Sequence, residues 1–309
     1  MMRIIVPRFI SALFVVIGVA LLVFLLIHLI PGDPVDVMLG ETAQPADKEA
    51  LRQTLGLDLP IHEQMLQFFK GLITFNWGTS IFSGRSVSSL LIERLPATVE
   101  LGLAALLVAI IIAFPLGILA AIRHKTFFDF GAMGFALVGV SIPNFWLGPL
   151  LILVGALWLG WFPISGREGW ASLVLPAFTL GTSMAAILSR MVRSSLLEVI
   201  NEDFVRTARA KGVPEWKVIV YHSLRNALLP IMTLLGLQLG ALLGGAVITE
   251  TVFSWPGVGL LTVEAIQRRD YPVVQASVLC ISLIYVLVNF TTDVVYHWID
   301  PRVDLRGKT

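Results

Sequence analysis

The feature that most constrains this chain is a series of six long apolar segments. Apolar side chains make up 56% of its 309 residues and charged ones only 14%. A water-soluble protein of this size has too few interior positions for so much hydrocarbon, so part of the surface must face lipid. A bilayer core needs about 20 apolar residues per helix. The six predicted spans are 9–30, 97–122, 131–159, 173–191, 227–248 and 273–297.

These spans are expected to be α-helices, because lipid cannot hydrogen-bond an open sheet edge and the runs lack the alternation of a membrane barrel. In the third span the string SIPNF, residues 141–145, interrupts the apolar run. Pro143 removes a backbone donor there, so we expect a kink or a split. The first span is longer than the apolar core of a secretory signal and is followed by PGDPVD. It is therefore expected to be a retained anchor.

Basic residues in the short connections predict the orientation. Two precede the first span, two join the second and third, seven lie from Arg190 to Arg225, and three follow the last span. The two short connections on the opposite side hold only three. Both termini and the loop before the fifth span are therefore expected to face the cytoplasm. In the long outer segment, PADKEALRQTLG and PIHEQMLQFFKGLI are each typical of a short amphipathic helix that starts with proline.

The expected organisation has three parts. Residues 1–31 form the N-terminal tail and first span, and residues 32–95 form an extracytoplasmic cap or arm. Residues 96–309 form a five-helix core that includes a cytoplasmic loop at 192–226. The net charge of +1 provides no overall basic field for nucleic acid. Cys280 is the only cysteine, which excludes internal disulfides and multi-cysteine metal sites.

Motifs for covalent chemistry are incomplete. The terminal RGKT matches the end of a phosphate-binding loop, but the earlier glycine would fall at Arg302 and no helix follows. IHEQM begins like a zinc-protease motif, but Leu66 occupies the place of the second histidine. The serines of FSGR and ISGR lack the strand–turn–helix setting of a hydrolase. We therefore predict neither an enzyme nor a metal site.

Few polar side chains lie within the spans. Asn289, Asp293 and His297 share one helix face and could form a proton or ion relay. Asp293 lies a turn from the cytoplasmic end, so contact with water or with a neighbouring helix is the favoured interpretation. Asn144 in the SIPNF string and Gln238 in the fifth span are candidates for a polar substrate path. A packing hydrogen bond is the favoured interpretation of Gln238.

The fifth span carries a stripe of glycines. Gly236, Gly240 and Gly244 recur every four residues, and Gly245 stands beside the last. Such a stripe lets another helix approach closely, either within this chain or from a partner.

A charged segment, NEDFVRTARAKGVPEWKVIVYHSLRNALLP, occupies residues 201–230. Asn201 is a suitable N-cap, Glu202 and Asp203 place acidic charge in the first turn, and basic charge gathers toward the other end, as the helix dipole favours. Gly212 can end this helix in the left-handed conformation, and Pro214 then begins the next. The sequence predicts a short polar helix, a glycine hinge and a second helix that returns to the membrane.

This loop is longer than a plain connection between two spans requires. We expect it to dock a soluble cytoplasmic partner, since Ala208 and Ala210 are small enough for close contact. The alternative is a helix resting on anionic lipid, for which the loop has the basic residues but lacks a strong apolar face.

The strings EDFVRTARAKG and RNALLP resemble the EAA loop of ABC-importer permeases, in the variant of the dipeptide, oligopeptide and nickel family. Further strings in the same order extend the resemblance over nearly the whole chain: IPGDPVDVML, LGLDLP, ATVELG, SIPNFW, RSSLLEV, ETVFSWPGVG, RRDYPVVQ and DVVYHWIDPR. Within that family the chain is most similar to the first permease subunit of dipeptide importers. The resemblance implies a type I (MetI-like) permease with six transmembrane helices in the bacterial inner membrane.

The resemblance also implies partners and a site. A second homologous permease subunit, two cytoplasmic ATPase subunits and an extracytoplasmic solute-binding protein would complete the importer. ATP and Mg²⁺ would be used by the ATPases, with no cofactor on this chain. The residues implied to couple to the ATPases are Glu202, Asp203, Arg206, Thr207, Ala208, Arg209, Lys211 and Gly212. The family's Glu-Ala-Ala is replaced here by Arg-Thr-Ala at 206–208.

The predicted function is therefore import of short peptides by alternating access. The first alternative is the same fold importing a nickel chelate or a glutathione-like compound, because the binding protein largely selects the substrate. An intramembrane hydrolase and a self-sufficient channel or proton-coupled carrier are alternatives from other classes.

Overall fold

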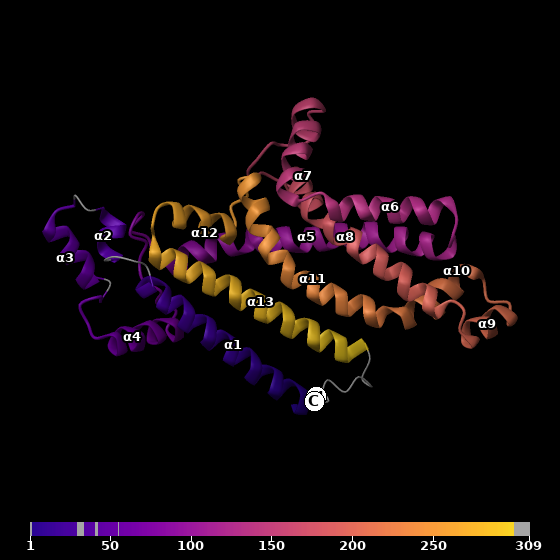
Figure 1. Ribbon diagram of the computed structural model, residues 1–309, viewed down its shortest axis with the longest axis horizontal. Helices are drawn as coiled ribbons and strands as arrows, with labels where there is room; N and C mark the ends of the chain where they lie inside the picture. The colour runs from indigo at the N-terminus through magenta and orange to yellow at the C-terminus, as the bar shows by residue number, and fades with distance from the viewer. Residues whose placement is uncertain (1, 30–33, 41–42, 55, 300–309) are drawn as a thin grey trace. The chain divides into compact units, whose positions relative to one another are not determined.

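The computed structural model describes residues 2–29, 34–40, 43–54 and 56–299 (Figure 1). Within these ranges the regular structure is helical, apart from one isolated bridge between Thr79 and Ser86. Five helices among the described residues are long and apolar enough to cross a membrane, and the number is six if a bent pair of helices is counted as one span. The prediction of an all-α membrane protein is confirmed.

Five predicted spans each correspond to one long helix. These helices are α1 (Met2–Leu29), α5 (Val87–Ile122), α8 (Ala171–Val199), α11 (Arg225–Val252) and α13 (Tyr271–Ile299). Several helices extend beyond the predicted ends. The clearest case is α5, which begins ahead of its apolar run because its first turns are buried against other helices rather than placed in lipid.

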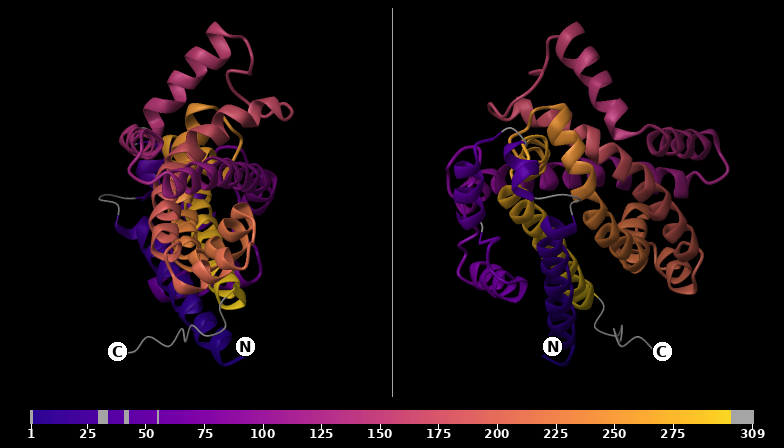
Figure 2. Two further views of the ribbon diagram at one scale, coloured as in Figure 1. Left: turned by 90° about the vertical axis from the view of Figure 1, so that its right-hand side faces the viewer. Right: turned by 60° about the vertical axis from the view of Figure 1, so that its left-hand side comes forward.

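The third span is split, as the SIPNF string predicts. Helix α6 (Phe127–Ser141) meets the segment formed by α7 (Asn144–Leu151) and the π-helix η1 (Ile152–Trp158) at an angle of 101° (Figure 2). Ile142, the residue before the proline, is extended, with φ −86° and ψ 115°. The ring of a following proline disfavours helical geometry at such a position. Pro143 itself occupies the N-cap of α7.

By its internal contacts the chain forms two compact units. The first comprises Met1–Thr98 and Pro256–Val286, and the second comprises Val99–Trp255 and Leu287–Thr309. This division by contacts differs in kind from the three-part division at 1–31, 32–95 and 96–309, which stays a prediction.

In its described residues the first unit contains four shorter helices, namely α2 (Pro34–Leu39), α3 (Pro45–Thr54), α4 (Ile61–Ile73) and α12 (Val258–Gln267). The two amphipathic helices expected in the outer segment are α3 and α4, whereas α2 and α12 were not expected.

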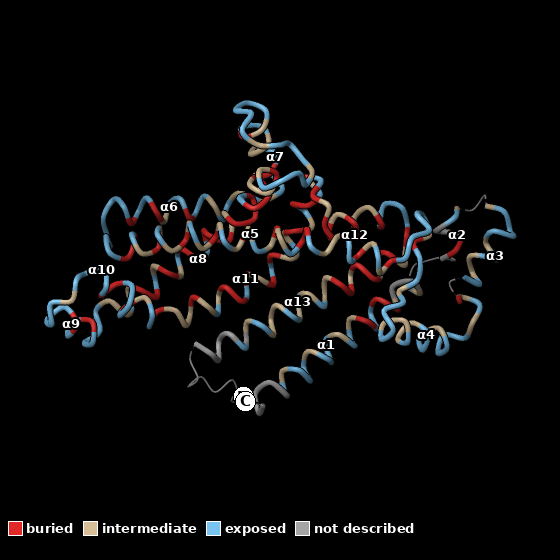
Figure 3. Tube along the Cα trace, turned by 180° about the vertical axis from the view of Figure 1, so that it is seen from behind, coloured by how far each residue is buried: buried red, intermediate tan, exposed pale blue. Residues whose placement is uncertain are grey.

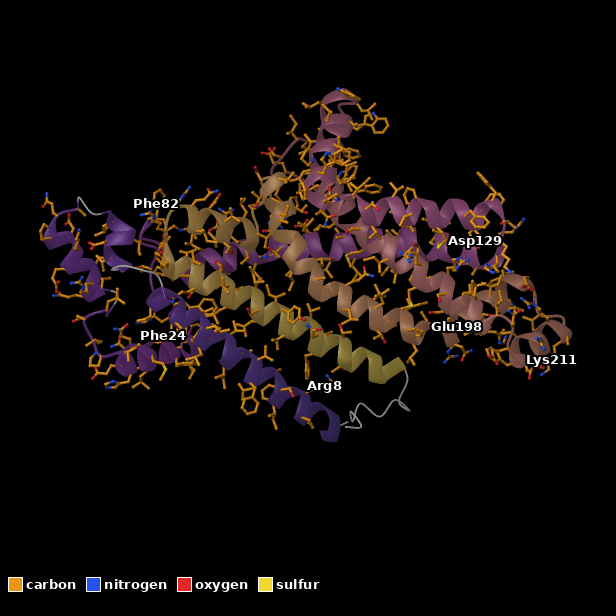
Figure 4. All side chains as sticks on the ribbon, viewed as in Figure 1. Arg8, Phe24, Phe82, Asp129, Glu198 and Lys211 are labelled. Atoms are coloured by element: carbon orange, nitrogen blue, oxygen red, sulfur yellow. The ribbon has the colours of Figure 1, made fainter. Side chains whose placement is uncertain are left out.

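Packed side chains and hydrogen bonds hold the first unit together. Phe24 of α1 lies against Phe68 of α4, with ring centroids 5.6 Å apart (Figure 4). Asp270, which is buried, accepts a hydrogen bond from the Ser80 hydroxyl at 2.5 Å and one from the Ile81 N–H at 3.2 Å. These bonds join the turn before α13 to the loop before α5.

Helix α8 is central to the second unit. Buried residues follow it along its length, and it contacts α6, α7 and α11 (Figure 3). Glycines set its distance from α5. A Cβ at Gly181 would lie 2.7 Å from the Ala105 carbonyl oxygen, and one at Gly117 would lie 2.7 Å from that of Ser189. The two helices therefore approach closely at two levels.

The glycine stripe of α11 faces several environments. A Cβ at Gly236 would collide with the Thr292 side chain on α13, and one at Gly245 would lie 3.2 Å from Leu180. Gly240 is buried, whereas a Cβ at Gly244 would meet no atom within 4 Å. Packing of this stripe against a partner stays a prediction.

Two expectations concern side chains or residues outside those that the structure describes. The side chains of Asp293 and His297 lie outside the described residues, so the relay they could form with Asn289 stays a prediction. The terminal RGKT lies outside the described residues as well.

Candidate functional site

The charged loop after α8 folds into two helices joined by a turn (Figure 1). Helix α9 (Asp203–Ala210) is followed by α10 (Glu215–Lys217) and by the π-helix η2 (Val218–Leu224), which runs without a break into α11. The short helix, the glycine turn and the second helix expected from the sequence are all present.

The start of α9 differs from the expectation. Glu202, not Asn201, occupies the N-cap, and no side chain bonds the first N–H groups of the helix. The reason lies in the preceding turn, where the Glu202 N–H donates to the Val199 carbonyl oxygen at 3.1 Å. That bond keeps Asn201 in the turn that ends α8. Asp203 lies in the first turn of α9, where the helix dipole favours an acidic group.

The end of α9 is a Schellman turn built on Gly212. Its N–H donates to the Arg209 carbonyl oxygen at 2.9 Å, and the Val213 N–H donates to the Ala208 carbonyl oxygen at 3.2 Å. Gly212 has φ +74°, the left-handed conformation that such a turn needs. Val213 also packs beside Ala208, which is the apolar contact that accompanies this motif. The expected hinge is therefore a well-bonded turn.

One face of α9 packs inside the chain. Val205 and Ala208 are buried together with Val218 of η2, and Val199 and Val213 pack around them; we call this set the loop core. Two expectations are corrected here. Ala208 faces inward, so it does not offer a close-contact surface to a partner, whereas Ala210 is exposed. The helix also has a definite apolar face, which its own chain covers.

Arg209 is likewise engaged within the loop. Its guanidinium donates to Glu215 at 2.7 Å and 3.2 Å across the glycine turn. This hydrogen-bonded carboxylate raises the pKa of Arg209. The ion pair joins the end of α9 to the start of α10, so Arg209 supports the shape of the loop.

The opposite face of α9 is exposed. Asp203, Arg206, Thr207 and Ala210 follow the i, i+3, i+4, i+7 spacing of one helix face; we call them the outer face of α9. Asp203 and Arg206 approach only to 3.5 Å, with side chains 97% and 70% exposed, so this pair contributes little. Lys211 follows at the exposed end of the helix (Figure 4).

Exposed aromatic rings in the same loop were missed by the sequence reasoning. Phe204, Trp216 and Tyr221 are all more than 40% exposed, and the Trp216 and Tyr221 rings lie 6.1 Å apart. Lys217 places its ammonium 5.4 Å from the Trp216 ring. Aromatic residues are enriched in protein interfaces, so the string EWKVIVY carried a usable signal.

A buried ion pair anchors α8 near this loop. Arg193 of α8 donates to both carboxylate oxygens of Asp129 in α6, at 2.6 Å and 2.8 Å (Figure 4). The Lys125 N–H and the His124 ring lie 2.9 Å and 3.1 Å from the same carboxylate, whose side chain is 3% exposed. Asp129 was not among the predicted functional residues. An acidic residue beside an apolar run was the only sequence signal.

The two candidates for a substrate path, Asn144 and Gln238, line the same small cavity although they are far apart in the sequence. Among the described residues, no group of three or more His, Cys, Asp or Glu side chains is placed to hold a metal ion.

Two family models match this chain. The model described as the binding-protein-dependent transport system inner membrane component matches residues 113–305, and the model of its N-terminal region matches residues 1–102. The chain belongs to this permease family. It is therefore a non-catalytic, multi-pass membrane component of a bacterial ABC importer.

Curated relatives resemble the permease over almost its whole length. The di/tripeptide transport system permease protein DppB of Pseudomonas aeruginosa (strain UCBPP-PA14) is 43% identical over 93% of this chain and 94% of that protein. DppB of Escherichia coli (strain K12), a dipeptide transport system permease protein, is 41% identical over the same shares. The glutathione transport system permease protein GsiC of Salmonella typhimurium (strain LT2) is 42% identical over 92% of this chain and 93% of that protein.

Solved structures share the fold. An inward-facing MetNI methionine ABC transporter matches with a TM-score of 0.58 and 20% identity over 68% of this chain and 96% of that chain. An amino acid ABC transporter crystallised with histidines matches with a TM-score of 0.51 and 16% identity over 70% and 95%. These matches confirm the type I permease fold.

Family membership also fixes the general assembly. A permease of this kind works with ATPase partners, which bind the ATP, and with a substrate-binding protein. The sequence-based prediction that the chain is not an enzyme is confirmed, and the intramembrane hydrolase is set aside.

Proposed function

We propose that this permease carries short peptides, dipeptides among them, into the cytoplasm by ATP-driven alternating access. Two of the relatives described above are named for dipeptide or di/tripeptide transport. The third is named for glutathione, which is itself a small peptide, and it is equally similar. A glutathione-like compound is therefore the alternative cargo.

The proposed assembly contains a second homologous permease subunit, two cytoplasmic ATPase subunits and an extracytoplasmic binding protein. Both termini and the α9 loop face the cytoplasm in this arrangement, and residues 32–95 lie on the outer side. The excess of basic residues in the proposed cytoplasmic connections supports this orientation.

The observation that carries the proposal is the division of α9 into two faces. The outer face and Lys211 are exposed to a partner, and the loop core fixes α9 to η2. Because η2 continues directly into α11, a displacement of α9 is passed to a membrane-spanning helix. The bond network of Asp129 and Arg193 holds the adjoining end of α8 against α6. Closure of the ATPases would thus move several helices together.

The predicted coupling residues then divide into two roles. Glu202, Asp203, Arg206, Thr207 and Lys211 are exposed and contact the ATPase. The other three, Ala208, Arg209 and Gly212, hold the loop in the shape that presents this surface.

Charge reversal tests this proposal. The double variant Arg206→Glu and Lys211→Glu is expected to insert normally but to lose uptake of dialanine in liposomes that hold the complete importer and its loaded binding protein. Lys70→Glu is the control, because Lys70 is an exposed basic residue of α4 on the proposed outer side, away from the ATPases. Uptake at the parent level by the double variant would overturn the coupling role. A parent importer that transports glutathione but does not transport dialanine would overturn the cargo assignment.

A further inference from the structure

A small cavity lies inside the second unit, where the broken span meets α8 and α11. Its volume is about 120 Å³. Its polar lining consists of Asn144 from α7, Ser183 from α8 and Gln238 from α11, and its apolar lining includes Met184 and Leu242. The lining contains no ionisable side chain. The cavity is therefore neutral, with a few polar groups in an apolar wall.

The two amides in this wall have no hydrogen-bond partner in the protein. Gln238 is only 8% exposed, and neither its Nε2 nor its Oε1 is bonded. The Oδ1 of Asn144 is also buried and unbonded. The Ser183 hydroxyl donates to the Leu180 carbonyl oxygen at 3.0 Å and so does not donate to either amide. Buried polar groups are nearly always paired in native proteins, so three unpaired atoms around one cavity require an explanation.

The backbone maintains this arrangement. Pro143 breaks the third span, so that Asn144 begins α7 at the edge of the cavity. Gly245 of α11 lies directly opposite, and a Cβ there would be 3.5 Å from Asn144 Nδ2 and 3.2 Å from Leu180. Interrupted helices at membrane depth are tolerated where they line a cavity or pack within protein. In secondary transporters such interruptions commonly form the substrate site.

We propose that Asn144 and Gln238 form a transient binding site for the peptide bond of the cargo during its passage. This inference rests on the proposed transport of short peptides. A side-chain amide carries both donors and an acceptor, and a peptide bond offers one N–H and one C=O. Both the side-chain amide and the peptide bond are uncharged, and this pairing does not depend on the side chains of the cargo.

The space and the wall suit this occupant. One water needs only about 10–15 Å³ of such volume, so the cavity is large enough for a group of several atoms. Met184 adapts its shape readily and offers an apolar contact to varied neighbouring side chains. The charged ends of a peptide find no counter-ion in this wall, so they must lie beyond it.

An ester analogue of the cargo tests the site. Liposomes that hold the complete importer are supplied with saturating binding protein loaded with dialanine or with alanyl-lactate, whose ester lacks the peptide N–H. We expect the unaltered importer to prefer the peptide roughly tenfold, as the loss of one hydrogen bond to a buried amide implies. Gln238→Leu and Asn144→Leu should bring the transport ratio close to one. Ser183→Ala, which removes a hydroxyl that donates to its own helix, should keep the parent ratio.

The outcomes separate this inference from the proposed function. An unaltered importer that carries neither compound refutes peptide transport and this site with it. An unaltered importer that carries dialanine without any preference over the ester refutes the site alone. The site alone is also refuted if the Gln238→Leu importer keeps its preference for dialanine while its melting temperature falls. The Gln238 amide then has only a structural role, with water as its hydrogen-bond partner. If Gln238→Leu does not insert, Gln238→Met, which is closer in length, gives the same decision.

Discussion

Replacing Gly212 should weaken the link between ATP hydrolysis and transport by straining the turn that supports α9. Gly212 has φ +74°, and an added Cβ would meet no atom within 4 Å, so the cost arises from backbone conformation and not from a clash. A left-handed backbone costs an ordinary residue about 1–2 kcal/mol, and Asn tolerates it better. A loss of about 1.4 kcal/mol raises the population of the opened turn roughly tenfold.

The assay is the ratio of peptide taken up to ATP hydrolysed by the complete importer in liposomes. We expect this ratio to fall in the order Gly212, Gly212→Asn, Gly212→Ala, Gly212→Val. Hydrogen exchange at the Val213 N–H, which donates to the Ala208 carbonyl oxygen, should quicken in the same order. A valine variant that couples as well as the parent would refute the reasoning. So would an asparagine variant that is worse than valine.

Three further predictions concern the packing around the loop and α8. Arg209→Ala removes a partly exposed ion pair with Glu215, so it should cost at most about 1 kcal/mol of unfolding free energy. In thermal melts, the difference in stability between this variant and the parent should disappear in about 1 M salt. Asp129→Ala leaves a largely buried arginine without its carboxylate and should cost about 3 kcal/mol in the same assay, where a loss below 1 kcal/mol contradicts its anchoring role. Gly181→Val would press a side chain against a carbonyl oxygen of α5, so this variant should not accumulate in the membrane. Gly131→Ala should accumulate normally, because a Cβ at Gly131 meets no atom within 4 Å. Equal membrane levels of the two variants would contradict the close approach of α5 and α8.

The membrane helices could be predicted from the sequence because each depends on a local property. An apolar run of about 20 residues has one favourable solution in lipid, and Pro143 interrupts the third run through its own ring and missing N–H. The start of α5 at Val87 could not be predicted in this way. Its first turns are stabilised by distant residues of α12 and α13, and no local pattern reveals such packing.

The α9 loop was predictable in outline and not in detail. The left-handed glycine follows from local stereochemistry, whereas the inward direction of Ala208 depends on contact with Val218, ten positions away. The pairing of Asp129 with Arg193 spans 64 residues and is decided by the packing of α6 on α8. Single residues suggested charge or polarity, and only the tertiary structure assigned their partners.

The most direct test of the central claim, that the outer face of α9 contacts an ATPase, is thiol cross-linking in the complete importer. The native thiol of Cys280 is buried, so an introduced cysteine is the reactive one. Thr207→Cys, on the exposed outer face, should cross-link to an ATPase subunit, with a yield that changes when nucleotide is added. Ala208→Cys, in the loop core, should not. If Thr207→Cys never joins an ATPase and is instead labelled by a membrane-impermeant reagent from outside the cell, the account is contradicted.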